Sequence, residues 1–102
     1  MAVTCTGGDR VLTASVSGEV DHHRARRIME ELEQAIDGMA PRQFTLDLSE
    51  VSFMDSSGIA VVLRAYRRVK ELGGEMVVAH PPAQAAKVLK AAGIERLIRL
   101  TE

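Results

Sequence analysis

Hydrophobic and polar residues alternate along the first part of the chain in the manner of β-strands. Two short segments, residues 3–6 and 11–17, flank Gly7-Gly8-Asp9, a tripeptide suited to a tight reversal. In the second segment every other residue is apolar, beginning with Leu12. The pattern predicts an N-terminal β-hairpin.

Three later segments have the apolar spacing of amphipathic helices. The first follows Asp21, the expected N-cap, and Gly38 is its expected terminator. Its apolar positions are Ala25, Ile28, Met29, Leu32, Ala35 and Ile36. The second opens at residues 55–58 and ends at Gly73-Gly74, with apolar positions at Ile59, Val62, Leu63, Tyr66 and Val69. The third starts after Pro81-Pro82 and ends near Gly93, with Val88 and Leu89 facing inward.

Strand-like apolar segments lie between and after these helices, at residues 44–48, 76–79 and 97–100. A hairpin followed by alternating helices and strands predicts one α/β domain over residues 1–102. Its mixed sheet would join the hairpin to parallel strands through right-handed crossover helices. Partners of such sheets meet the loops beyond the carboxyl ends of the strands, where residues 55–58 are expected.

Composition narrows the class of protein. The 102 residues are 46% hydrophobic, which favours a folded domain, and the 13 basic and 14 acidic residues give no reason to expect a nucleic-acid partner. The apolar run at residues 59–63 is too short to cross a membrane, and the N-terminus lacks a signal-peptide pattern. The single cysteine, Cys5, cannot form an internal disulfide. We expect a cytoplasmic protein.

The segment Asp55-Ser56-Ser57-Gly58 is the strongest candidate for chemistry. A serine at the start of a helix lies beside free backbone N–H groups and the positive end of the helix dipole, which both favour a phosphate. Gly58 would leave the first turn open to another protein. A simpler interpretation also stands, in which Asp55 or Ser56 is an N-cap and Gly58 accommodates packing.

Longer stretches carry a family resemblance. Residues 46–59, which read Leu-Asp-Leu-Ser-Glu-Val-Ser-Phe-Met-Asp-Ser-Ser-Gly-Ile, resemble the signature of the STAS domain family. Residues 18–23, Gly-Glu-Val-Asp-His-His, and 73–78, Gly-Gly-Glu-Met-Val-Val, agree with it. The chain is most similar to bacterial anti-sigma factor antagonists of the sporulation anti-sigma-F factor antagonist type, over roughly residues 10–100.

The resemblance implies a binding switch. In that family the first serine of Asp-Ser-Ser-Gly is phosphorylated by the anti-sigma factor, itself a serine kinase, and a serine phosphatase removes the phosphate. The unphosphorylated form binds the anti-sigma factor and so releases the sigma factor. Carried to this chain, Ser56 is the phosphoacceptor and Asp21 lies on the partner-facing surface. Asp55, Ser57 and Gly58 frame the acceptor.

Other chemistry is weakly supported. On a helix the adjacent His22 and His23 would point about 100° apart, and His80 is remote in sequence, so we expect no metal site and no cofactor. No Gly-x-Ser-x-Gly elbow surrounds Ser56, so we expect no enzyme. The basic residues between 64 and 70 form either a solvated face or a contact for an acidic partner.

Two alternative functions remain on the sequence alone. One is a STAS scaffold subunit of a larger sensory complex. The other is a small-ligand-binding α/β domain, which would need a concave pocket with convergent polar groups, and the sequence identifies no residues for one.

Overall fold

The computed structural model describes residues 2–102, which form five strands, three α-helices and one 3₁₀-helix. The strands are β1 Val3–Gly8, β2 Val11–Val20, β3 Gln43–Met54, β4 Glu75–Ala79 and β5 Arg99–Thr101. The helices are α1 Ala25–Met39, α2 Ser57–Glu71 and α3 Ala83–Ala91, followed by the 3₁₀-helix η1 Ile94–Arg96.

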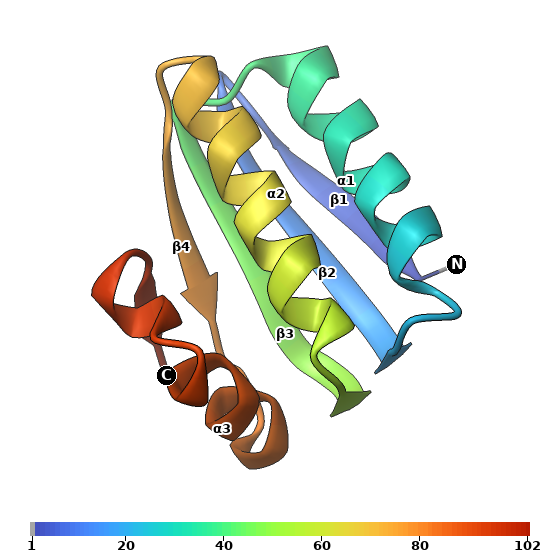
Figure 1. The fold of residues 1–102 in the computed structure, drawn as a ribbon. Helices are drawn as coiled ribbons and strands as arrows, with labels where there is room; N and C mark the ends of the chain where they lie inside the picture. The colour runs from blue at the N-terminus through green and yellow to red at the C-terminus, as the bar shows by residue number, and fades with distance from the viewer. Residues whose placement is uncertain (1) are drawn as a thin grey trace.

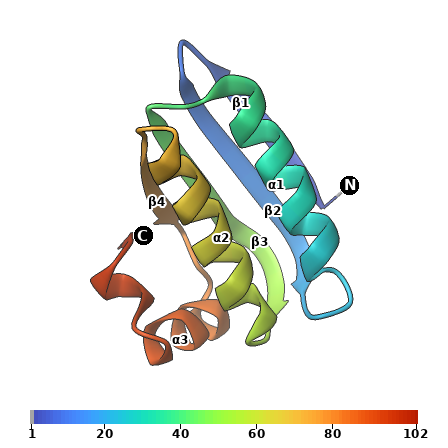
Figure 2. The same cartoon turned by 45° about the horizontal axis from the view of Figure 1, so that its top comes forward.

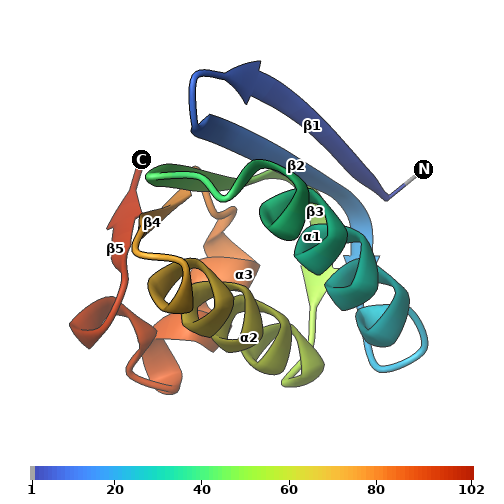
Figure 3. The same cartoon turned by 90° about the horizontal axis from the view of Figure 1, so that it is seen from above.

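The strands make one sheet in the order β1-β2-β3-β4-β5. β1 runs antiparallel to β2, and all other neighbours are parallel. The predicted mixed sheet is therefore confirmed. α1 and α2 lie side by side across one face of the sheet (Figures 1 and 2). The view from above shows both on the same side, as two right-handed crossovers in one direction require (Figure 3).

The core lies between this sheet face and the helices. Alternate strand residues are buried there, as the period of two demands. They are Leu12, Ala14, Val16, Phe44, Leu46, Leu48, Met76 and Val78. The helices contribute Ile28, Leu32, Ile36, Val62, Val69 and Leu89. No polar or charged residue within 2–102 is fully buried, so apolar burial supplies the main stabilisation.

The hairpin turn lies one residue later than the sequence predicts. Gly8 pairs with Val11, and the two-residue loop is Asp9-Arg10. Both loop residues have positive φ, 54° and 63°, as a type I′ turn requires.

The ends of the first helix also differ from the sequence prediction. Asp21 does not cap α1 itself, because a turn separates it from Ala25, where the helix begins. Gly38 is not the terminator, since α1 continues to Met39 and Ala40 takes the left-handed conformation at φ 47°. The Ala40 N–H donates to the Ile36 carbonyl and closes the last turn.

The other predicted helix ends are confirmed. Gly73 follows α2 with φ 83°, and Gly93 follows α3 with φ 77°. Gly74 approaches the carbonyl of Pro41 so closely that a Cβ would collide with it. The glycines therefore stand where the backbone requires them.

Two strands differ in extent from their predictions. β3 continues through Met54, beyond the strand-like segment of residues 44–48 that the sequence predicts. The last strand is Arg99–Thr101 rather than residues 97–100, because η1 occupies the preceding turn and Leu97 lies outside the sheet, 52% exposed.

Candidate functional site

Ser56 lies between the carboxyl end of β3 and the start of α2. It is the N-cap residue of α2, but its side chain makes no capping hydrogen bond. The residue is exposed, and its hydroxyl has no hydrogen-bond partner among residues 2–102. Ser56 is therefore accessible from solvent.

The side chain of Asp55, rather than that of Ser56, accepts a hydrogen bond at the start of α2. Its carboxylate Oδ1 accepts the Ser57 N–H at 2.8 Å, and its carbonyl accepts the Gly58 N–H at 3.0 Å. The hydrogen bond from the Ser57 N–H is the leading cause that lowers the pKa of Asp55, with further lowering by the Ser57 hydroxyl and by His22. Asp55 is therefore ionised at neutral pH.

Asp55 also joins this loop to the segment that follows β2. Its Oδ2 accepts the His22 N–H at 3.3 Å, and its own N–H donates to the Val20 carbonyl at 3.1 Å. Two segments 33 residues apart in sequence are thus held against each other.

Asp21 organises the second of these segments. Its Oδ1 accepts the N–H groups of His23 and Arg24, both at 3.1 Å. Its carbonyl accepts the Ala25 N–H at 2.8 Å, which leads the turn into α1. The structure therefore places Asp21 beside the loop of residues 55–58, because Asp21 is next in sequence to His22, whose N–H donates to Asp55. Contact of either carboxylate with a partner stays a prediction.

Gly58 is buried in the first turn of α2. A Cβ built on it would lie 2.6 Å from the sulfur of Met54 and closer still to the Met54 Cγ. The packing interpretation of Gly58 accounts for this geometry. Contact between Gly58 and a partner stays a prediction.

Comparison with known protein families identifies the family of this domain. The sequence matches the STAS domain model over residues 2–102. The chain belongs to the STAS domain family.

One curated relative and two solved structures illustrate what the chain is similar to. An anti-sigma F factor antagonist of Paenibacillus polymyxa is 32% identical over 88 residues, which are 86% of this chain and 75% of the relative. The solved structure of unphosphorylated SpoIIAA, an anti-sigma factor antagonist, is 25% identical with a TM-score of 0.81, covering 99% of this chain and 89% of that one. SpoIIAA of Bacillus in its phosphorylated form is 25% identical with a TM-score of 0.72, covering 99% and 92%.

The histidines of this STAS domain are not arranged as the sequence suggested. His22 and His23 lie in the turn before α1, and their ring centroids are 4.0 Å apart, so the expectation that they diverge on a helix is wrong. Within residues 2–102 no three His, Cys, Asp or Glu side chains gather as metal ligands.

The basic residues of α2 are largely used within the domain. Arg64 pairs with Glu33 at 3.0 Å, and Arg68 pairs with Asp37 at 2.6 Å, which ties α2 to α1. Lys70 pairs with Glu75 at 3.0 Å. These pairs are exposed, so solvent screening leaves each of them with little effect on stability. The ion pairs favour the interpretation that the basic residues of α2 form a solvated face rather than a contact for an acidic partner.

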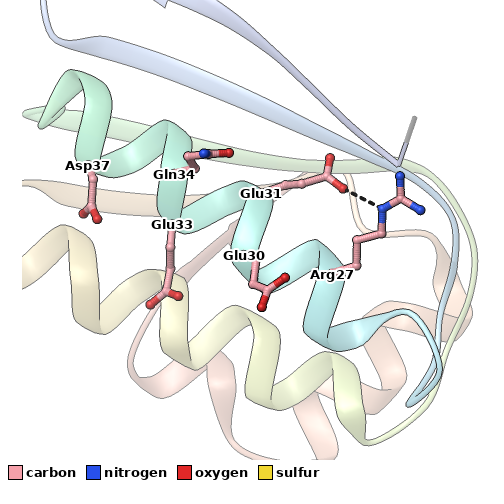
Figure 4. Close-up of a pocket in the computed structure, with 6 residues that line it drawn as sticks. All are labelled: Arg27, Glu30, Glu31, Glu33, Gln34 and Asp37. Carbon is pink, nitrogen blue, oxygen red and sulfur yellow. Dashed lines mark hydrogen bonds and ion pairs between the residues drawn. The ribbon is translucent and has the colours of Figure 1, made fainter.

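A shallow hollow of about 660 Å³ lies along α1 (Figure 4). It is lined by Arg27, Glu30, Glu31, Glu33, Gln34 and Asp37. All six come from one helix, and Arg27 is paired with Glu31 at 3.3 Å. Because no second element contributes polar groups, the hollow gives no support to a small-ligand site. No helix within residues 2–102 is both long enough and apolar enough to span a bilayer.

Sequence reasoning missed one contact that shapes this site. Arg24 donates from Nη1 to the Glu19 carbonyl at 2.7 Å and from Nη2 to the Ser17 carbonyl at 3.2 Å. A Cβ on Gly18 would lie 2.6 Å from the Arg24 Nη1, and the Gly18 φ is 84°. Arg24 therefore holds the irregularly paired end of β2 through two hydrogen bonds, and in the sequence Gly18 is the residue that indicates this irregularity.

Proposed function

We propose that this STAS domain is an anti-sigma factor antagonist controlled by phosphorylation at Ser56. Its unphosphorylated form binds an anti-sigma factor that is also a serine kinase, and so releases the sigma factor. The kinase transfers a phosphate to the Ser56 hydroxyl, which abolishes binding, and a serine phosphatase restores the free form. The domain has no turnover of its own and acts in the cytoplasm.

The observation that carries this proposal is the state of Ser56. Its hydroxyl is exposed and unpartnered within the described chain, while the residues around it are held by hydrogen bonds. The relatives named anti-sigma factor antagonists, including one solved in phosphorylated form, support the assignment of partner and modification.

The electrostatic effect of a phosphate at Ser56 follows from the same contacts. A phosphoserine carries about −1.5 to −2 charges at neutral pH. The sequence suggested that helix amides would receive it, but the Ser57 N–H already donates to the Asp55 carboxylate. The phosphate would therefore stay outward and add to the negative charge of Asp55. A partner surface shaped for a neutral hydroxyl would have to bury this charge, which costs several kcal/mol.

The test is phosphorylation with the anti-sigma kinases of the source organism, ATP and Mg²⁺, followed by mapping of the site by mass spectrometry. We expect modification of Ser56 and its loss in Ser56→Ala. Ser52→Ala, which removes another exposed serine of the same segment, is the matched control and should be modified normally. Efficient phosphorylation of Ser56→Ala at Ser57 or elsewhere would overturn the assignment.

A second measurement separates a binding switch from an unfolding event. Phosphorylation should weaken binding to the anti-sigma factor by orders of magnitude, since each ~1.4 kcal/mol is tenfold in affinity. The melting temperature should barely change, because solvent screens the exposed phosphate. Equal affinity of both forms, or loss of cooperative melting, would contradict the proposal.

A further inference from the structure

The last part of β3 lacks the neighbour that its first part has. β4 pairs with β3 only from Gln43 to Asp47, whereas β3 continues to Met54. On its other edge β3 stays paired with β2 as far as Met54, which lies opposite Val20. Met54 is 1% exposed, so its main-chain groups need partners on the edge that β4 has left.

Gln84, the second residue of α3, supplies both partners with its side chain. The Met54 N–H donates to Gln84 Oε1 at 2.8 Å, and Gln84 Nε2 donates to the Met54 carbonyl at 2.7 Å. A strand residue presents its N–H and C=O to the same neighbour, and a carboxamide offers one acceptor and one donor side. The side chain therefore replaces one residue of a missing strand.

Met54 connects the two hydrogen bonds from Gln84 to the phosphoacceptor loop, residues 55–58, in two ways. Through the main chain it precedes Asp55, whose N–H is fixed on the opposite edge by Val20 and whose carboxylate binds Ser57. Through its side chain it packs against Gly58, the far end of the same loop. A displacement of Met54 would therefore move both ends of the loop that carries Ser56.

We propose that Gln84 is a positioning residue for the phosphoacceptor loop: its two hydrogen bonds to Met54 set the placement of the Ser56 hydroxyl for the kinase. This inference rests on the proposed function of Ser56. It also assigns α3 a direct connection to the site, although α3 is separated from Ser56 by more than twenty residues of sequence.

The experiment measures phosphorylation of wild type, Gln84→Ala and Gln84→Glu by the anti-sigma kinase, at a temperature at which all are folded. Gln84→Glu keeps an acceptor for the Met54 N–H but has no donor for the carbonyl. Gln34→Ala is the matched control, since Gln34 is an exposed helical glutamine with no hydrogen bond within the described chain. We expect kcat to fall about 10- to 100-fold in both Gln84 variants, the range of small misplacements of a reacting group, and to stay unchanged in Gln34→Ala.

Hydrogen exchange of the Ser57 amide gives a readout that needs no kinase. The exchange should become faster in both Gln84 variants and stay unchanged in Gln34→Ala. The reason is that the hydrogen bond between Asp55 and the Ser57 amide depends on the position of Met54, which Gln84 holds. If wild type is phosphorylated and both Gln84 variants keep its kcat and its Ser57 exchange rate, the positioning role is wrong. If wild type is not phosphorylated at Ser56, the proposed function fails, and the exchange rates alone decide whether Gln84 positions the loop.

Discussion

The contact between Gly58 and Met54 makes a quantitative prediction for Gly58→Ala. The added methyl group would lie 2.6 Å from the Met54 sulfur, well inside van der Waals contact. Met54 is 1% exposed, and its main chain is hydrogen-bonded to Gln84. To avoid the new methyl group, the Met54 side chain must therefore change rotamer within a packed core. Overpacking of this kind costs about 1–3 kcal/mol, against a gain of about 0.5–1 kcal/mol from replacing glycine in a helix.

Gly58→Ala should therefore lower the free energy of unfolding by roughly 1 kcal/mol, the difference between the midpoints of these two ranges. For a domain of this size, the melting temperature falls about 4–8 °C for each kcal/mol. Gly38→Ala is the matched control, because Gly38 lies in α1 with no atom within 4 Å of its missing Cβ. That substitution should stabilise the domain.

A double-mutant cycle with Met54→Ala tests the cause. Met54→Ala alone should cost about 2–5 kcal/mol, as large-to-small core changes do. In that background Gly58→Ala should no longer destabilise, since the new methyl group enters the space left by Met54. Urea denaturation of the four proteins measures the coupling. If Gly58→Ala destabilises equally with and without Met54, the clash is not the reason for the glycine.

Two further predictions concern the surface of the site. The carboxyl of Asp55 should titrate below its ordinary pKa of 3.8. Because the folded-state pKa is lowered, the contribution of Asp55 to stability is present above pH 3.8 and is lost as the pH falls through the folded-state pKa. An NMR titration with a midpoint at or above 3.8 would refute this. Phe53, three residues before Ser56, is 43% exposed, so Phe53→Ala should weaken binding to the anti-sigma factor about tenfold or more while changing stability by less than ~0.5 kcal/mol. Leu97→Ala, at a position 52% exposed near β5, should leave that affinity unchanged, and equal affinities of all three proteins would remove Phe53 from the interface.

The periodicity of the chain predicts most of the elements because it reports burial directly. The alternation from Leu12 to Val16 and the helical stripe from Ala25 to Ile36 both face the core as expected. The second half of β3 escapes this reasoning, since residues 49–53 carry mainly polar or exposed side chains and the strand is irregularly paired with β2. A strand with one partner and shifted register loses the regular alternation that reveals it.

The candidate site is only partly predictable for a different reason. The motif of residues 55–58 locates the proposed acceptor, and the residues at positions 18–23 locate the neighbouring segment. Their meeting depends on the Asp55–His22 and Asp55–Val20 hydrogen bonds, which join residues more than thirty apart. The contact of Gln84 with Met54 joins residues 30 apart in sequence, and an exposed glutamine in the first turn of a helix gives no local signal of it.

These long-range contacts bear on how a phosphate could act without refolding the domain. The N–H groups of Met54, Asp55, Ser57 and Gly58 all have partners within the domain. A phosphate on Ser56 could take one of them only by displacing its present acceptor, which is Gln84, Asp55 or the Val20 carbonyl. That exchange would replace one satisfied group with an unsatisfied one. The loop therefore has little to gain by rearranging, and the added charge stays where a partner meets the surface. In the proposed switch, a fixed loop with one unpartnered hydroxyl would convert a local modification into a change of binding, and the contacts that hold the loop would matter as much as the serine.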